Sequence, residues 1–316
     1  MSRRRVLRSP RFATPLAWLV LVLGGALSAG CGKSDPAADG GGGDAGADHA
    51  AVEVGPVHSS CPTTLAGPAL VRVAWSEGVA FCIDSTEVTN AQYQAFLTGA
   101  AANPPVQADQ CQWNTSLAPE TTTPGCPAFD PVGRANFPVV CVNWCDADAY
   151  CRSVGKYLCR AGSLDGDNAG PVKNPLAAGG SQWIIACSND GAQSYPYTGA
   201  GMPGVCVDKK YVSATPGVQP VMSAAMCQGG VAGLYDMSGN ASEWQDNCVA
   251  ATTTPATGAD LGKTDACDAY GGAVSSDYAD TSCTAATSAT DTLAHFTRSQ
   301  VAPDNGFRCC ADAQFL

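Results

Sequence analysis

The chain has 316 residues, of which 45% are hydrophobic and only 14% are charged. This length fits one large domain or two small ones, and the hydrophobic share is enough for a sizeable core. The formal net charge is −11, and removing the five arginines of the first thirty residues leaves −16. So acidic a surface repels nucleic acid and anionic lipid, and we expect no nucleic-acid binding. A simpler explanation of the negative charge is that it only keeps the protein soluble.

The number of cysteines, seventeen, is unusually high. Export would pair them as disulfides, whereas a reducing cytosol would leave them as thiols or metal ligands. If Cys31 is set aside, sixteen remain, which is enough for eight bonds. The paired CxxC motifs of a zinc ribbon do not occur, so the sequence predicts a disulfide-rich exported domain.

The N-terminus has the pattern of an export signal. Arginines precede an apolar stretch, Leu16–Leu27, that is too short to span a bilayer comfortably. Small residues before Cys31 are what a lipoprotein signal peptidase accepts. We therefore predict a signal peptide over residues 1–30 and a lipid on Cys31 that anchors the protein to a membrane. The alternative is an ordinary secretory signal followed by an unrelated cysteine.

Residues 31–60 are expected to form a flexible tether. Gly, Ala and Asp dominate them up to about residue 51, and a segment with almost no large apolar residue cannot form a core of its own. The globular domain would then occupy residues 61–316 and stand just off the membrane. This arrangement places the protein in the cell envelope, lipid-anchored at the periplasmic or the cell-surface face.

The first elements of the globular part alternate between strand and helix patterns. Residues 81–84 predict a short strand, and the helix that follows begins with a capping box formed by Thr89 and Gln92. Residues 137–142 predict a second strand, after which Asn143 can cap a second helix.

Farther along the chain the patterns are weaker until one distinctive segment. Residues 161–180 predict a surface loop, and Trp183 is a core candidate in the ordered stretch that follows. The distinctive segment is Gly233–Trp244, in which Ser-Gly-Asn forms a tight turn. This turn brings the carboxylates of Asp236 and Glu243 close to the carbonyl oxygens between them. Clustered hard oxygen atoms suit Ca²⁺, and the alternative is an Asx-type turn without a metal.

Four blocks in this order resemble the formylglycine-generating enzyme (sulfatase-modifying factor) family, from about residue 65 to the C-terminus. They are the two capped helices with their flanking residues, the segment GLYDMSGN-x-x-EW and the segment Gly306–Cys309. The resemblance implies an irregular α+β fold similar to that of C-type lectins. Such a domain has twisted antiparallel strands, few helices, many loops and, in this chain, many disulfides.

The resemblance also implies individual site residues. The implied disulfides are Cys151–Cys309 and Cys187–Cys283, and the other twelve cysteines have no template. The implied calcium ligands are the carboxylates of Asp236 and Glu243 and the carbonyls of Gly239 and Ala241. Calcium is therefore the predicted cofactor.

The family's reaction oxidises a substrate cysteine and depends on two cysteines, five residues apart, that hold Cu(I). Here the corresponding window, residues 272–283, contains only Cys283, which fits a structural position. Ser275 and Ser276 are poor substitutes because neutral hydroxyls bind this soft ion weakly. We therefore do not expect copper binding.

Other kinds of catalytic site find little support. A copper site moved to Cys309–Cys310 or to the Cys141/Cys145 pair requires thiols that are not in disulfides. An iron site requires two histidines and a carboxylate, and two of the three histidines lie in or beside the tether. A Ser–His–Asp triad through His295 has no supporting motif.

The sequence therefore favours a non-catalytic lipoprotein with a ligand-binding or structural role. The ligand would be a glycan, a peptide or an envelope protein. The alternative is an oxidoreductase of the formylglycine-generating type that acts on a protein cysteine.

Overall fold

The computed structural model describes residues 59–75, 80–160, 181–197, 199–213, 217–251, 257–272, 281–283 and 296–315. The chain divides into two units, residues 1–52 and 53–316, and every described residue belongs to the second. The predicted signal peptide, Cys31, the loop 161–180, residues 273–280 of the copper window and His295 lie outside the described residues. Within the described part, no helix is long and apolar enough to cross a bilayer.

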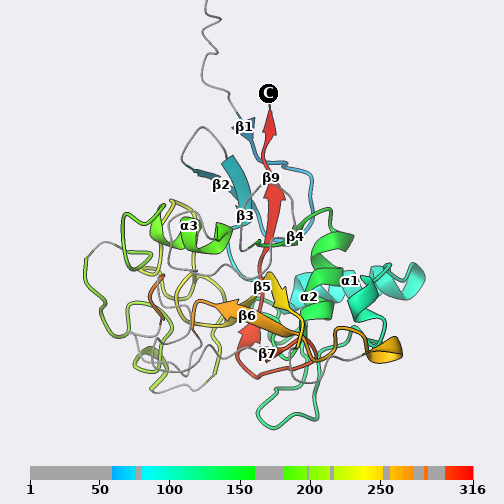
Figure 1. Ribbon diagram of the computed structural model, residues 1–316. Helices are drawn as coiled ribbons and strands as arrows, with labels where there is room; N and C mark the ends of the chain where they lie inside the picture. The colour runs from blue at the N-terminus through cyan, green and yellow to red at the C-terminus, as the bar shows by residue number, and fades with distance from the viewer. Residues whose placement is uncertain are drawn as a thin grey trace, which may run out of the picture. The chain divides into compact units, whose positions relative to one another are not determined.

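Short elements joined by long connections make up the fold (Figure 1). The α-helices are α1 (Asn90–Ala102), α2 (Trp144–Ser153) and α3 (Gln182–Ser188). The 3₁₀ helices are η2 (Asp109–Cys111), η3 (Tyr211–Ser213) and η4 (Gly258–Asp260). The strands are β1 (Ser59–Ser60), β2 (Leu70–Ala74), β3 (Ala80–Asp84), β4 (Tyr157–Leu158), β5 (Ser242–Val249), β6 (Ala266–Tyr270), β7 (Phe296–Thr297), β8 (Asn305–Gly306), β9 (Cys309–Asp312) and β10 (Gln314–Phe315).

These strands form two small sheets of four strands each and a short pair. The first sheet has the order β2-β3-β9-β4, and the second has the order β7-β6-β5-β8. All described pairings are antiparallel except that of β5 with β8. β8 and β9 are neighbours in sequence but belong to different sheets, so the connection between them joins the two sheets. The fold is thus the irregular α+β fold that the sequence predicts.

Both predicted helix starts are confirmed. The Thr89 hydroxyl accepts a hydrogen bond from the Gln92 backbone N–H, and the Gln92 side chain accepts one from the Thr89 N–H at 2.9 Å. Asn143 caps α2 in the same reciprocal way with Asp146. Each cap satisfies backbone groups that a helix end leaves without partners.

The predicted strand at residues 137–142 is wrong. Pro138 makes only an isolated bridge with Thr89, and the Val139 N–H donates to the Val88 carbonyl at 2.9 Å. The extended run ends at Cys141, whose φ is +61°. The segment is nevertheless buried, and an apolar run alone does not distinguish a strand from a core segment of irregular structure.

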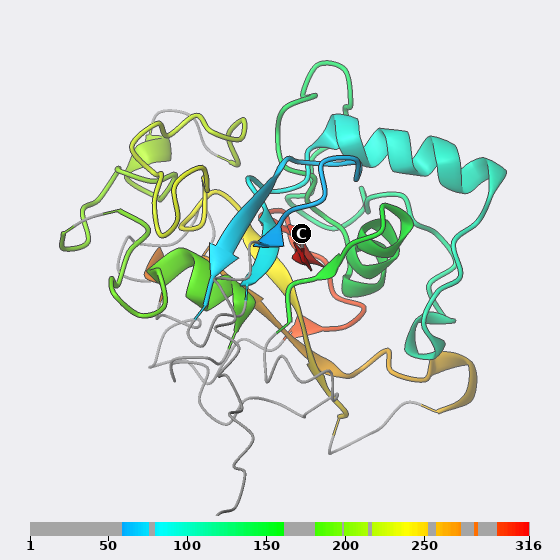
Figure 2. The same ribbon diagram turned by 90° about the horizontal axis from the view of Figure 1, so that it is seen from above.

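Aromatic side chains form the core between α1 and α2. Tyr93 stacks on Tyr150 with 5.8 Å between ring centroids, and Phe96 and Phe307 contact Tyr150 edge to face. Figure 2 shows α1 and α2 on one side of the β2–β3 hairpin and α3 on the other. Trp183 of α3 is buried in the second core cluster, as predicted.

Every cysteine except Cys31 is in a disulfide. The bonds are Cys61–Cys82, Cys111–Cys145, Cys126–Cys141, Cys151–Cys309, Cys159–Cys310, Cys187–Cys283, Cys206–Cys227 and Cys248–Cys267. Two of them, Cys151–Cys309 and Cys187–Cys283, are those that the family resemblance implies. So many bonds are typical of a protein that folds in an oxidising compartment.

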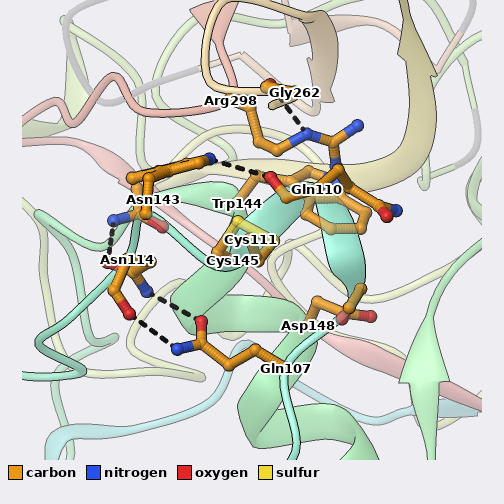
Figure 3. Close-up of a disulfide and its surroundings, with 12 residues drawn as sticks. Gln107, Gln110, Cys111, Asn114, Asn143, Trp144, Cys145, Asp148, Gly262 and Arg298 are labelled. Carbon is orange, nitrogen blue, oxygen red and sulfur yellow. Dashed lines mark hydrogen bonds between the residues drawn. A yellow bond between two sulfur atoms is a disulfide. The ribbon is translucent and has the colours of Figure 1, made fainter. Parts of the chain in front are cut away.

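A buried polar network fastens the loop after α1 to the start of α2 (Figure 3). Next to the Cys111–Cys145 bond, the Asn143 side-chain amide donates to Asn114 Oδ1 at 3.2 Å. Asn114 Nδ2 in turn donates to Asp146 Oδ1 at 2.8 Å. Burial raises the pKa of Asp146 to about 7, although the hydrogen bonds that it accepts from the Asn114 side chain and from the Asn143 backbone N–H lower it.

This pKa predicts that the domain loses stability as the pH rises from about 4 to about 7. In that range the folded protein keeps a proton on Asp146 that the unfolded chain has lost, so the free energy of unfolding falls by up to about 1.4 kcal/mol per pH unit. Thermal melts of the variant Asp146→Asn should show a flatter pH dependence. Asp109→Asn, the same change at an exposed residue, serves as the control, and an equally steep profile in Asp146→Asn would contradict the prediction.

Candidate functional site

A single arginine organises the buried residues around the predicted calcium site. Arg308, between β8 and β9, is completely buried and forms a bidentate pair with Glu243 of β5, with two N–O distances of 2.7 Å. Its Nη1 donates to the Asp84 carbonyl at 3.0 Å, and Nη2, which also bonds Glu243, contacts the carbonyls of Tyr235 and Asp236 at 3.0 and 3.2 Å. Arg308 thus joins the last part of the chain to the end of β3 and to the Gly233–Trp244 segment.

Two further carboxyl groups lie in the same buried region. Glu87 Oε1 accepts a hydrogen bond from the Asn240 side-chain amide at 3.0 Å, and Asp236 Oδ2 accepts one from the Met222 N–H at 2.6 Å. Glu87 Oε2 and Asp236 Oδ1 are buried without a hydrogen-bond partner in the described part of the chain. Three carboxyl groups thus share one guanidinium, which leaves an excess of negative charge if all of them ionise.

Burial and mutual repulsion shift the titration of these groups. Burial raises the pKa of Asp236 to about 6. Burial, and after it the negative charge of Asp236, raises the pKa of Glu87 well above its usual range. The excess charge can therefore be neutralised by protons or by a cation, and carboxylate and carbonyl oxygens are suitable ligands for Ca²⁺.

The four predicted calcium ligands lie within the segment Gly233–Trp244, at the start of β5 and in the turn before it, but their oxygens have different surroundings. The Glu243 carboxylate accepts hydrogen bonds from Arg308 and from Trp183 Nε1, the latter at 2.9 Å. The Ala241 carbonyl lies 3.8 Å from the place where a side chain at Gly271 would begin, and the Met237 carbonyl lies 3.6 Å from it. Gly239 has a φ of +78° and packs against the backbone of residue 207.

A calcium site in this segment would depend mainly on carbonyl oxygens. The described residues contain no group of three or more Asp, Glu, His or Cys side chains that could hold a metal ion. The unpartnered Asp236 Oδ1 is the free carboxylate oxygen of the predicted set, because both oxygens of Glu243 are engaged by Arg308. The calcium site therefore stays a prediction.

A second buried ion pair lies beside the first. Lys156 Nζ contacts Asp84 Oδ1 at 2.5 Å and donates to the Pro68 carbonyl at 3.0 Å, while Asp84 Oδ2 accepts the Cys309 N–H at 2.9 Å. Burial raises the pKa of Asp84 to about 6 despite the neighbouring Lys156. Asp84 and Arg308 thus fix the strands on either side of the Cys151–Cys309 bond.

The roles of Arg308, Glu87, Asp84 and Lys156 were not predicted from the sequence. Arg308 and Glu87 do lie in blocks that carry the family resemblance. An arginine and a glutamate among apolar neighbours signal buried charges, and buried charges need partners. The partners themselves lie 65 to 225 residues away and could not be read from local spacing.

A cleft of about 380 Å³ opens between α1, α2 and the turn that precedes β2. The side chains that line it are small or apolar, with an aromatic floor. They are Ala66, Gly67, Gln92, Ala95, Phe96, Gly99, Ala100, Asn103, Pro105, Tyr150, Ser153 and Val154. None of these residues carries a charge. The cleft was not predicted from the sequence.

The fold, the disulfides and the Gly233–Trp244 turn define a class of disulfide-rich α+β domains. The sequence model of the "Sulfatase-modifying factor enzyme 1-like domain" matches residues 20–313, so the chain belongs to this family. The match begins within the predicted signal peptide. No curated protein gives a significant match to the sequence.

Several solved structures are similar to the chain. CarF is 20% identical, with a TM-score of 0.44, and the match covers 82% of this chain and 99% of CarF. PvdO from Pseudomonas aeruginosa is 17% identical, with a TM-score of 0.48 and coverages of 76% and 82%. Treponema denticola variable protein 1 is 16% identical, with a TM-score of 0.42 and coverages of 78% and 94%.

Proposed function

We propose that the protein is a lipid-anchored envelope protein whose sulfatase-modifying-factor domain binds a ligand or has a structural role, without oxidising cysteine. The observation that carries the proposal is the pairing of all sixteen domain cysteines. Holding Cu(I) requires thiolates, and a cysteine in a disulfide has none to offer. Cys31, the one cysteine that remains, cannot form a pair within the chain.

An oxidation assay tests this proposal. The mature protein is incubated with Cu(I), oxygen and a peptide that contains one cysteine, and the peptide is analysed by mass spectrometry after hydrazide capture of aldehydes. We expect no aldehyde above the protein-free control. Catalytic turnover to an aldehyde would support the alternative, an oxidoreductase of the formylglycine-generating type.

The lipid anchor is tested separately. In cells labelled with palmitate, the wild-type protein should carry the label and the variant Cys31→Ser should not, because the cysteine sulfur is the attachment point. The Cys31→Ser protein should also be absent from the membrane fraction. A mutant that still incorporates palmitate would show that Cys31 is not the site.

Calcium, if bound by the carbonyls of the Gly233–Trp244 turn and by Asp236, should stabilise the folded domain. A calcium concentration of 100 times the dissociation constant adds about 2.7 kcal/mol to the free energy of unfolding. Melting temperatures measured with calcium and with chelator should therefore differ for the wild type and much less for Asp236→Ala. Identical wild-type melting curves under both conditions would count against the site.

A further inference from the structure

We propose that the cleft between α1 and α2 binds a neutral, mainly apolar small molecule with one hydroxyl or carbonyl group. This inference deepens the proposed ligand-binding role and rests on it. The volume of about 380 Å³ lies at the lower end of the range for small-molecule sites, which suits a ligand on the order of ten to twenty non-hydrogen atoms. Most of the lining residues belong to α1 and α2, which lie on the same side of the β2–β3 pair in Figure 2.

The floor of the cleft contains a tyrosine whose hydroxyl has no hydrogen-bond partner among the described residues. Tyr150 is 1% exposed, and its ring is fixed by contacts with Tyr93, Phe96 and Phe307. Within the described residues, its hydroxyl makes no hydrogen bond. A ligand that covers this hydroxyl displaces its water contacts, so a ligand with a polar atom that can replace them is favoured.

Gly67 keeps this hydroxyl open to the cleft. Its φ is +98°, and a Cβ atom there would lie 2.9 Å from Tyr150 Oη. Any side chain at this position would therefore cover the hydroxyl. Two other polar groups of the lining are already engaged, because Ser153 Oγ donates to the Tyr150 carbonyl and Gln92 Oε1 accepts from Thr89. Asn103 also lines the cleft, but it is exposed. The Tyr150 hydroxyl is thus the deep polar contact for a ligand.

Charge determines which ligand class the cleft accepts. The lining carries neither a cation for an anionic ligand nor a carboxylate for a cationic one. Lys156, the cation nearest to Gly67, is already bound to Asp84 and to the Pro68 carbonyl. The net negative charge of the chain repels anions as well. A neutral molecule that buries apolar surface against Ala, Gly, Val and Phe therefore fits best.

The test uses the mature protein and the fluorescent neutral probe N-phenyl-1-naphthylamine. We expect saturable binding with one site per chain in the wild type and at least tenfold weaker binding in Gly99→Leu, whose added side chain occupies the cleft. A Cβ atom at Gly99 meets no atom within 4 Å, and leucine favours helix over glycine, so this variant should fold. Ala101→Leu adds a leucine to an exposed position of the same helix that does not line the cleft, and it should bind as the wild type does.

The role of the hydroxyl is tested with Tyr150→Phe, in competition against the probe. This variant should bind 1-naphthol about three- to tenfold more weakly than the wild type while binding naphthalene equally well. The proposal is overturned if the wild type shows no saturable binding or if Gly99→Leu binds the probe as tightly as the wild type does. It is also overturned if Tyr150→Phe changes the affinities for 1-naphthol and for naphthalene by the same factor. The cysteine-oxidation assay does not involve this cleft, so the two proposals can fail separately.

Discussion

Replacing Arg308 by methionine is expected to destabilise the domain by about 3–5 kcal/mol. The substitution leaves Glu243 buried without its cation, and breaking one side of a buried ion pair typically has an effect of this size. It also removes the hydrogen bonds to the carbonyls of Asp84, Tyr235 and Asp236. Denaturant-induced unfolding followed by circular dichroism would measure the loss.

The matched control is Lys263→Met, which breaks an ion pair on the surface. Lys263 pairs with Asp260, and the two side chains are 45% and 61% exposed. Exposed pairs contribute at most about 1 kcal/mol, so the control variant should remain close to wild-type stability. Equal losses of unfolding free energy in the two variants would show that burial of the Arg308–Glu243 pair does not increase its contribution to stability.

The second large effect concerns two disulfides that lie next to each other on β9. Cys151–Cys309 and Cys159–Cys310 both connect the α2–β4 region to the last strands, across 158 and 151 residues. While one bond is intact, the other closes a ring of only about ten residues. Loop entropy therefore predicts that removing either bond by paired Cys→Ala substitutions reduces stability by only about 3 kcal/mol.

Removing both bonds should have a much larger effect. The chain then loses closure of a ring of about 55 residues, since Cys187–Cys283 still shortens the long loop. The expected total is about 7 kcal/mol, a large part of the stability of a typical domain. The four-alanine variant should therefore be mostly unfolded at 37 °C. If it were no less stable than a variant lacking one bond, the loop-entropy account would be wrong.

Local patterns predict the parts of this fold that depend on neighbouring residues. The capping residues indicate the starts of α1 and α2 in the sequence, because a cap is a contact between residues only three positions apart. The segment 137–142 shows the limit of such patterns. Its apolar residues correctly indicate burial, but burial beneath loops and burial in a sheet require the same residue types.

The site is less predictable than the helices. The turn with Asp236 and Glu243 is visible in the sequence, whereas the Arg308 that binds Glu243 belongs to a strand connection 65 residues farther along. The cleft depends on small residues of two helices that are separated by more than forty residues. Small side chains leave no periodic signal of their own, so a cavity between them becomes visible only when the helices are packed.

A count of free thiols tests the central claim most directly. The mature, lipidated protein is denatured without reductant, and its thiols are titrated with a maleimide that changes the mass by a known amount. Eight disulfides and an acylated Cys31 leave no thiol, so we predict an unlabelled protein. Two labelled cysteines within residues 59–316, together with stoichiometric binding of Cu(I), would contradict the claim that this domain lacks the thiolate pair needed for cysteine oxidation.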